Sequence, residues 1–166
     1  MIHKSSLTLY IFLFCISLLS VTEVSAQETK IFEIKNGSII NSGNNAKTIP
    51  TQLLYSLKAT IYVKNNSVLK VTGSQNPLVL KTYDASSLNI LKTKNTLFNK
   101  VQIIKIQLNE VSDLNSSIDF STISDFNNLS HIYIISYFKC RKSQIRAFIR
   151  NVNPEITVYF ENVNPS

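Results

Sequence analysis

The sequence is poor in the residues from which most catalytic and metal-binding sites are built. Its 166 residues include three glycines, two cysteines, two histidines and no tryptophan. So few glycines leave little material for a loop whose backbone N–H groups cradle a phosphate. The composition therefore points to no particular reaction, and we expect neither a cofactor nor a metal site.

The first 26 residues have the three zones of a secretory signal peptide. A short segment with one lysine, Met1 to Lys4, precedes an apolar run from Leu7 to Leu19, and the zone ends in Val24-Ser25-Ala26. Small residues at the last and third-last positions suit signal peptidase, and the apolar run is too short to span a bilayer comfortably. We predict cleavage after Ala26 and export, to the periplasm or the exterior of a bacterial host. An uncleaved anchor is the alternative.

Cleavage would leave residues 27–166 as a single globular domain. Lys4 and Glu23 leave together, so the formal net charge of +7 is unchanged. The mature chain would keep one cysteine, Cys140, and one histidine, His131. Since one cysteine cannot form an internal disulfide, we expect stability to come from a packed core, with no transmembrane segment after cleavage.

The first half of this domain predicts β-hairpins. Asn36-Gly37 separates two apolar runs within residues 31–40, and Asn65-Asn66 separates two more within residues 59–72. Both dipeptides tolerate the left-handed turn that matches strand twist. We assign residues 27–50 to a lead-in hairpin that could pack loosely. A short helix led by Pro50 is expected within residues 48–57, and a strand over 78–82.

The second half predicts short β-α-β units. Apolar strand cores begin at Val101, Ile132 and Ile156, and helical spacing occupies residues 119–128 and 143–151 between them. Strands that alternate with short helices favour a partly parallel sheet. The predicted fold class is accordingly α/β or α+β in one small domain.

The stretch from Phe120 to Ile135 resembles one unit of a leucine-rich repeat. Leu129, Ile132 and Ile134 fit the spacing L-x-x-L-x-L of that family, although Tyr137 replaces the usual asparagine or cysteine. The resemblance implies that the strands line a binding face. A generic α/β sheet explains the same pattern.

Aligning Val101, Ile132 and Ile156 in register predicts which side chains share a face. Side chains alternate along a strand, so Ile104, Ile135 and Tyr159 would form one row and Tyr133 would lie in the next. That face is either buried, as parallel sheets usually are, or a binding surface.

A thiol is the first candidate for chemistry. Cys140 lies between Lys139 and Arg141-Lys142, cations that would favour the reactive thiolate. However, a predicted strand of about 25 Å separates Cys140 from His131, the only available imidazole base. We therefore weigh a possible reactive thiol at Cys140 against a structural cysteine at a strand end or an intermolecular disulfide.

Charged residues offer a second candidate site. Lys142, Arg146 and Arg150 recur every four residues and would form a basic stripe on one helix, suited to an anionic partner or simply solvated. The remaining lysines are dispersed in the sequence without interleaved aromatics, so no nucleic-acid partner is expected. The acidic residues match no calcium loop, and we expect Asp119 and Asp125 to cap helices or fix turns.

Taken together, the sequence predicts a small exported protein that acts as a non-catalytic interaction or structural module. Its partner would be an unidentified protein or an anionic envelope component. The alternatives are a thiol-redox or other enzyme centred on Cys140 and a carrier of an apolar ligand.

Overall fold

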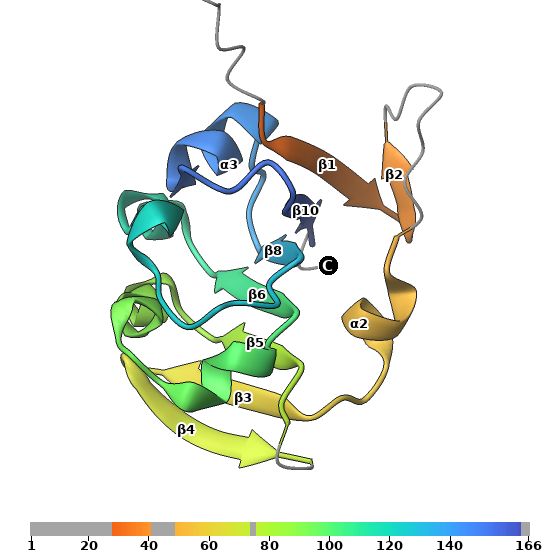
Figure 1. Cartoon of the computed structure of the whole chain (residues 1–166). Coiled ribbons are helices and arrows are strands. Elements are labelled where there is room, and N and C mark those ends of the chain that lie inside the picture. Colours follow the sequence, from red (N-terminus) through yellow and green to blue (C-terminus); the bar gives the residue numbers. More distant parts are fainter. Residues whose placement is uncertain (1–27, 41–48, 74–75, 164–166) are drawn as a thin grey trace, which may run out of the picture.

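Eight strands form one mixed sheet that runs through the whole domain (Figure 1). The structure is a computed structural model that describes residues 28–40, 49–73 and 76–163, so the predicted signal peptide lies outside it. The order of the strands across the sheet is β2-β1-β10-β8-β6-β5-β3-β4. Their bounds are β1 (Lys30–Lys35), β2 (Ser38–Ile40), β3 (Thr60–Lys64), β4 (Ser67–Thr72), β5 (Val79–Thr82), β6 (Ile103–Leu108), β8 (His131–Ser136) and β10 (Thr157–Asn162).

The six inner strands run parallel, and a hairpin closes each edge. β2 pairs antiparallel with β1, and β4 pairs antiparallel with β3. Both turns use the left-handed backbone that asparagine and glycine tolerate: φ is 51° at Asn36, 73° at Gly37, 51° at Asn65 and 56° at Asn66. The two predicted hairpins and the α/β class with a partly parallel sheet are confirmed.

Five of the parallel strands follow one another both along the chain and across the sheet. The residues in register are Thr60, Val79, Ile103, His131 and Thr157, so successive strands are offset by 19, 24, 28 and 26 residues. The sixth, β1, comes from the start of the chain and pairs with the last strand, Lys30 opposite Thr157. Ile31 and Ile34 of β1 are buried. The lead-in hairpin is thus an integral part of the sheet.

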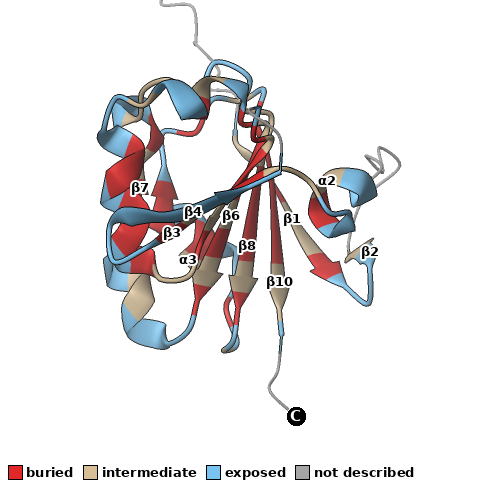
Figure 2. Cartoon of the chain, turned by 90° about the horizontal axis from the view of Figure 1, so that it is seen from below, coloured by how far each residue is buried: buried red, intermediate tan, exposed pale blue. Residues whose placement is uncertain are grey.

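A layer of short helices covers one face of the sheet, which we call the core face. It contains the 3₁₀ helices η1 (Ala85–Lys92), η2 (Thr96–Lys100), η3 (Val111–Asn115) and η4 (Phe120–Thr122), the helix α3 (Lys142–Phe148), and the paired strands β7 (Ile118–Asp119) and β9 (Ile149–Arg150). The larger hydrophobic core lies between this layer and the sheet. Figure 2 shows the buried central strands and the exposed edge strand β4.

Two predicted helices are shorter than the sequence pattern suggested. The only helix in residues 119–128 is the 3₁₀ turn η4, because Ile123 takes an extended conformation and Asp125 adopts a left-handed φ of 64°. The helix predicted over 143–151 ends at Phe148. The chain then pairs with β7 through Ile149 and Arg150 before Asn151 turns with φ 53°.

The opposite face of the sheet, which we call the α2 face, is covered in part by the short helix α2 (Thr51–Tyr55). Leu54 packs there on a second hydrophobic cluster that includes Ile34, Ile103, Tyr133 and Tyr159. The helix follows Pro50, as predicted. Within the described ranges no helix is long and apolar enough to cross a membrane.

The strand register differs from the one inferred from the sequence. Ile104, not Val101, lies opposite Ile132, because the backbone N–H of Val101 closes η2 on Phe98 and the strand begins only at Ile103. This shift of three residues exchanges the two faces, so Ile104 belongs to the core face and the prediction that groups it with Ile135 and Tyr159 is wrong.

Candidate functional site

A row of lysine and aromatic side chains crosses the α2 face. Strand pairing places seven residues in register on seven neighbouring strands. Since residues paired in register share a face, all seven side chains belong to the α2 face. In order from β4 to β1 they are Lys70, Tyr62, Lys81, Lys105, Tyr133, Tyr159 and Phe32.

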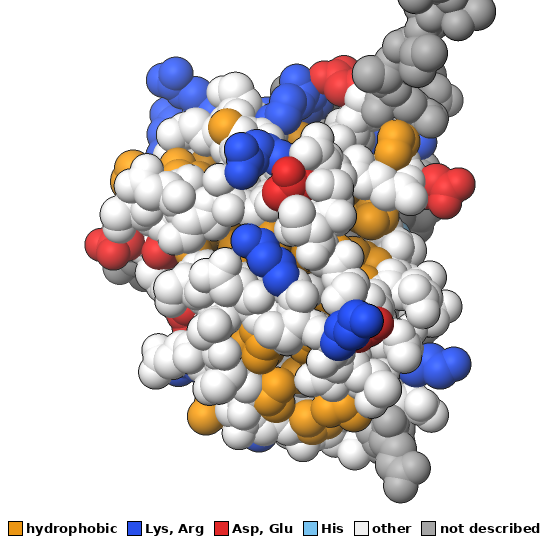
Figure 3. Space-filling model, turned by 60° about the vertical axis from the view of Figure 1, so that its left-hand side comes forward, with side chains coloured by type: hydrophobic (Ala, Val, Ile, Leu, Met, Phe, Trp, Pro, Cys, Tyr) orange, Lys and Arg blue, Asp and Glu red, His pale blue; other side chains and the backbone are white. Residues whose placement is uncertain are grey.

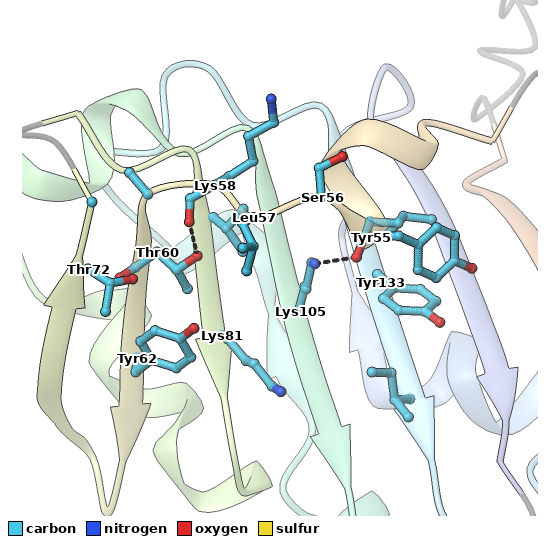
Figure 4. Close-up of a pocket in the computed structure, with 15 residues that line it drawn as sticks. Tyr55, Ser56, Leu57, Lys58, Thr60, Tyr62, Thr72, Lys81, Lys105 and Tyr133 are labelled. Carbon is cyan, nitrogen blue, oxygen red and sulfur yellow. Dashed lines mark hydrogen bonds between the residues drawn. The ribbon is translucent and has the colours of Figure 1, made fainter.

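The middle of this row lies in an open hollow of about 600 Å³ (Figure 4). The segment that joins α2 to β3 forms one wall of the hollow, and the strands β3, β5, β6 and β8 form its floor. A second hollow of about 570 Å³ adjoins the β3–β4 hairpin and is lined by Lys64, Lys70 and Tyr83 among others. Lys70 and Tyr62, which are neighbours in the row, line one hollow each, so the two hollows adjoin along it.

The first hollow has positively charged side chains in its lining. Lys58, Lys81 and Lys105 line it, and no carboxylate does among the described residues. Lys105 is half-buried, and its Nζ donates a hydrogen bond of 2.6 Å to the backbone carbonyl of Leu54 at the end of α2. Burial, and secondarily the charge of Lys81, lowers the pKa of Lys105. An anion in the hollow would relieve both effects.

Aromatic rings hold the ammonium groups of two lysines of the row, Lys70 and Lys81. The Nζ of Lys70 lies 4.9 Å from the ring centroid of Tyr62, and the Nζ of Lys81 lies 4.9 Å from that of Tyr83. The two rings stack on each other with centroids 5.9 Å apart. Cation–π contacts of this kind fix a lysine head without neutralising it. The arrangement therefore keeps two positive charges in defined places on the sheet.

The tyrosines predicted as binding residues are mostly core. Tyr159 is 1% exposed and Tyr133 is 4% exposed, both beneath the α2 segment. The hydroxyl of Tyr133 donates a hydrogen bond to Glu161, and burial together with this carboxylate raises the pKa of Tyr133 well above its ordinary value. Ile135 is half-buried at the edge of the first hollow. Of the predicted row of Ile104, Ile135 and Tyr159, only Ile135 lines the hollow; Tyr133, predicted for the next row, also lines it and pairs with Tyr159.

Cys140 is a buried thiol in this structure. Its side chain is 3% exposed, and burial raises its pKa, which disfavours the thiolate. The side chain of Asn162 holds the backbone around it through hydrogen bonds of 2.9 and 3.0 Å. His131 lies at the opposite end of β8, within 2.8 Å of Ser130 Oγ. The geometry brings no base to the thiol.

The predicted basic stripe is divided between two elements. Lys142 and Arg146 lie on α3, whereas Arg150 lies in β9, where its charge contributes to lowering the pKa of Asp119 after the larger effect of hydrogen bonds from Ser121. Arg146 forms an ion pair with Glu28. On the side of the molecule seen in Figure 3, the blue side chains are spread out. A continuous stripe on one helix is therefore not formed.

The acidic residues serve local structure. Asp119 accepts a hydrogen bond from the backbone of Ser121 at the start of η4, and Asp125 accepts one of 2.7 Å from the backbone of Asn95. The predicted capping role is confirmed for Asp119, whereas the carboxylate of Asp125 binds a residue 30 positions away in the sequence. The described residues contain no group of three or more His, Cys, Asp or Glu side chains placed to hold a metal ion.

No family model, curated protein or solved structure matches this chain. The candidate site therefore rests on the geometry of the α2 face alone. Sequence reasoning missed Lys81 and Lys105 because 24 residues separate them, and Tyr83, which lies two residues after Lys81, gives no sign that the two lysines share a row. Only the pairing of β5 with β6 brings the two lysines and the tyrosines of β3 and β8 together.

Proposed function

We propose that the protein is an exported, non-catalytic binding module that recognises an anionic group in the first hollow of the α2 face. The observation that carries the proposal is the in-register pair Lys81 and Lys105, which lines a hollow without a carboxylate. The two lysines stand on neighbouring strands, which lie about 4.8 Å apart. Burial and then the charge of Lys81 lower the pKa of Lys105, and a bound anion would offset this cost.

Lysine suits a contact with an extended anionic partner. Its ammonium is a compact point charge on a flexible stem, and it lacks the planar fork with which arginine grips a single carboxylate or phosphate. The three arginines of the chain lie at positions 141, 146 and 150, outside the residues that line either hollow. An anionic envelope component would contact the first hollow, since the carboxylate of Asp84 lines the second one.

The architecture supports a binding role for the α2 face. Val101, Ile104 and Ile106 repeat the spacing of Leu129, Ile132 and Ile134, and the register places the two sets side by side. We propose that the domain is a short solenoid of the leucine-rich-repeat type, in which the sheet face opposite the short helices meets the ligand. The turn that precedes β10 departs from the pattern, since Glu155 holds the first position.

A carrier of a small amphipathic anion is the second candidate. The volume of the first hollow lies within the range of small-molecule sites, about 300–1,000 Å³. Leu57 is fully exposed at its wall, and Ile135 and Val79 contribute apolar surface. A small amphipathic anion could place its apolar tail beside these residues and its acidic head group at the lysines. It would then use both the apolar surface and the positive charge of the hollow.

Calorimetric titration with four probes tests the proposal. The mature chain, residues 27–166, is titrated with polygalacturonate fragments, with polyphosphate, with a medium-chain fatty acid and with neutral dextran fragments. We expect binding of at least one polyanion, weakened by added salt because the charges are partly exposed, and no binding of dextran. A medium-chain fatty acid that binds while both polyanions fail would favour the carrier. Failure of all the anionic probes would contradict the proposal.

Charge-matched variants locate the site. Lys81→Gln with Lys105→Gln should weaken polyanion binding about tenfold or more, since a hydrogen bond to a charged group contributes about 1.5–3 kcal/mol. Lys92→Gln with Lys94→Gln removes the same charge from exposed positions and should change the affinity little. Loss of binding in Lys142→Gln with Arg146→Gln would instead assign the partner to α3.

Export has its own test. Expression with the complete leader in a bacterial host and mass measurement of the protein recovered outside the cytoplasm should give a chain that begins at Gln27. A chain that keeps Met1 and stays with the membrane would contradict the predicted cleavage and favour the uncleaved anchor.

A further inference from the structure

Lys105 differs from a surface lysine in three structural respects. Its side chain is half-buried, its Nζ is fixed at 2.6 Å from the carbonyl of Leu54, and the next residue in its row is another lysine, Lys81. A lysine amine becomes nucleophilic when desolvation or a neighbouring cation favours its neutral form. Both conditions meet at Lys105, and the lowered pKa agrees with them.

The hollow leaves the nitrogen accessible to a small reactant. Lys105 lines an open cavity of about 600 Å³, so the amine is not sealed inside the core. The other titratable side chains that line the hollow are Lys58 and Lys81 together with Tyr55, Tyr62 and Tyr133. No carboxylate among the described lining residues is present to hold the amine in its charged form.

We infer that Lys105 is a selectively reactive amine that captures an aldehyde or ketone carrying a carboxylate or phosphate. The neutral nitrogen adds to the carbonyl carbon to give a carbinolamine, which loses one water molecule to form an imine. The two protons lost by the nitrogen leave with the carbonyl oxygen in that water, so no oxidant or reductant takes part. Lys81 would bind the negative group, and to this extent the inference rests on the proposed function.

Pyridoxal 5′-phosphate is a suitable probe because it joins an aldehyde to a phosphate. The mature chain is treated with less than one equivalent of the probe, the imine is reduced with borohydride, and the labelled lysines are mapped by mass spectrometry. We expect Lys105 to be labelled several-fold faster than the exposed Lys92 and Lys94. Pyridoxal without the phosphate should label Lys105 more slowly.

Two variants separate the contributions. Lys105→Arg keeps the positive charge but cannot form an imine, so it should lose the dominant label while its thermal unfolding midpoint stays near that of the unmodified chain. Lys81→Gln should slow the labelling of Lys105 several-fold and reduce the advantage of the phosphate. Its circular dichroism spectrum serves as the control for folding.

Labelling that simply follows exposure, with Lys92 and Lys94 modified before Lys105, would overturn the inference. The proposed function is judged separately, by calorimetric titration of the unmodified chain with the polyanions. If the chain binds polyanions but Lys105 is not labelled selectively, only the inference of a reactive amine is contradicted. If Lys105 is labelled selectively but the chain binds no polyanion, only the proposed binding function is contradicted.

Discussion

Replacing Tyr159 with alanine tests whether the α2 face is part of the core. The side chain is 1% exposed, and its ring lies 6.1 Å from that of Phe32 and 6.0 Å from that of His131, measured between centroids. Truncating a buried aromatic residue typically costs about 3–5 kcal/mol. A domain of this size has about 5–15 kcal/mol of stability in total, so the variant should be strongly destabilised.

Urea unfolding followed by circular dichroism measures this cost. With a slope of about 2 kcal/mol/M, the midpoint should fall by about 2 M. Tyr137→Ala is the matched control: that side chain is 40% exposed, and its removal should change the stability by less than about 0.5 kcal/mol. An unchanged midpoint in Tyr159→Ala, combined with loss of a binding partner, would refute the assignment of Tyr159 to the core.

Three further predictions concern stability. The hydroxyl of Thr82 is buried without a hydrogen-bond partner, so Thr82→Val should raise the free energy of unfolding by about 1 kcal/mol in urea titration. A Cβ on Gly73 (φ +85°) would lie 2.7 Å from Ala59, whereas one on Gly37 (φ +73°) would meet nothing within 4 Å, so Gly73→Ala should lower the thermal midpoint more than Gly37→Ala. Burial acts to raise the pKa of Asp84, but hydrogen bonds from Ser86, Ser87 and the backbone of Asn65 outweigh it and lower the pKa below 3.8. The ionised carboxylate then contributes stability at neutral pH that is lost as the pH falls through the lowered pKa, and Asp84→Asn should flatten this loss in acid titration below pH 3.8.

Local signals in the sequence predicted the local elements. Asn-Gly and Asn-Asn specify left-handed turns, so both hairpins were predictable, and Pro50 marked the start of a short helix. Apolar runs separated by helical spacing indicated parallel strands. Ile123 and Ile149 show the limit of such signals, because each takes an extended conformation and ends a helix that the apolar spacing would allow to continue.

Long-range pairing was not predictable in the same way. An apolar strand such as Val101 to Leu108 is compatible with several registers, and the position at which η2 ends selects one of them. Nothing in the first hairpin indicates that β1 pairs with β10 at the far end of the chain. The row of lysine and aromatic side chains on the α2 face depends on the register of β6 and on the pairing of β1 with β10. The candidate site could therefore be recognised only in the folded structure.

Chemical-shift mapping of the ¹⁵N-labelled mature chain with a polyanion that binds tests the central claim most directly. The account predicts that the backbone amides that move lie in β5 and β6 around Lys81 and Lys105, and that they stop moving in the Lys81→Gln, Lys105→Gln variant. Shifts confined to α3 around Lys142 and Arg146, or the same shifts in the double variant, would contradict the assignment of the binding site to the α2 face.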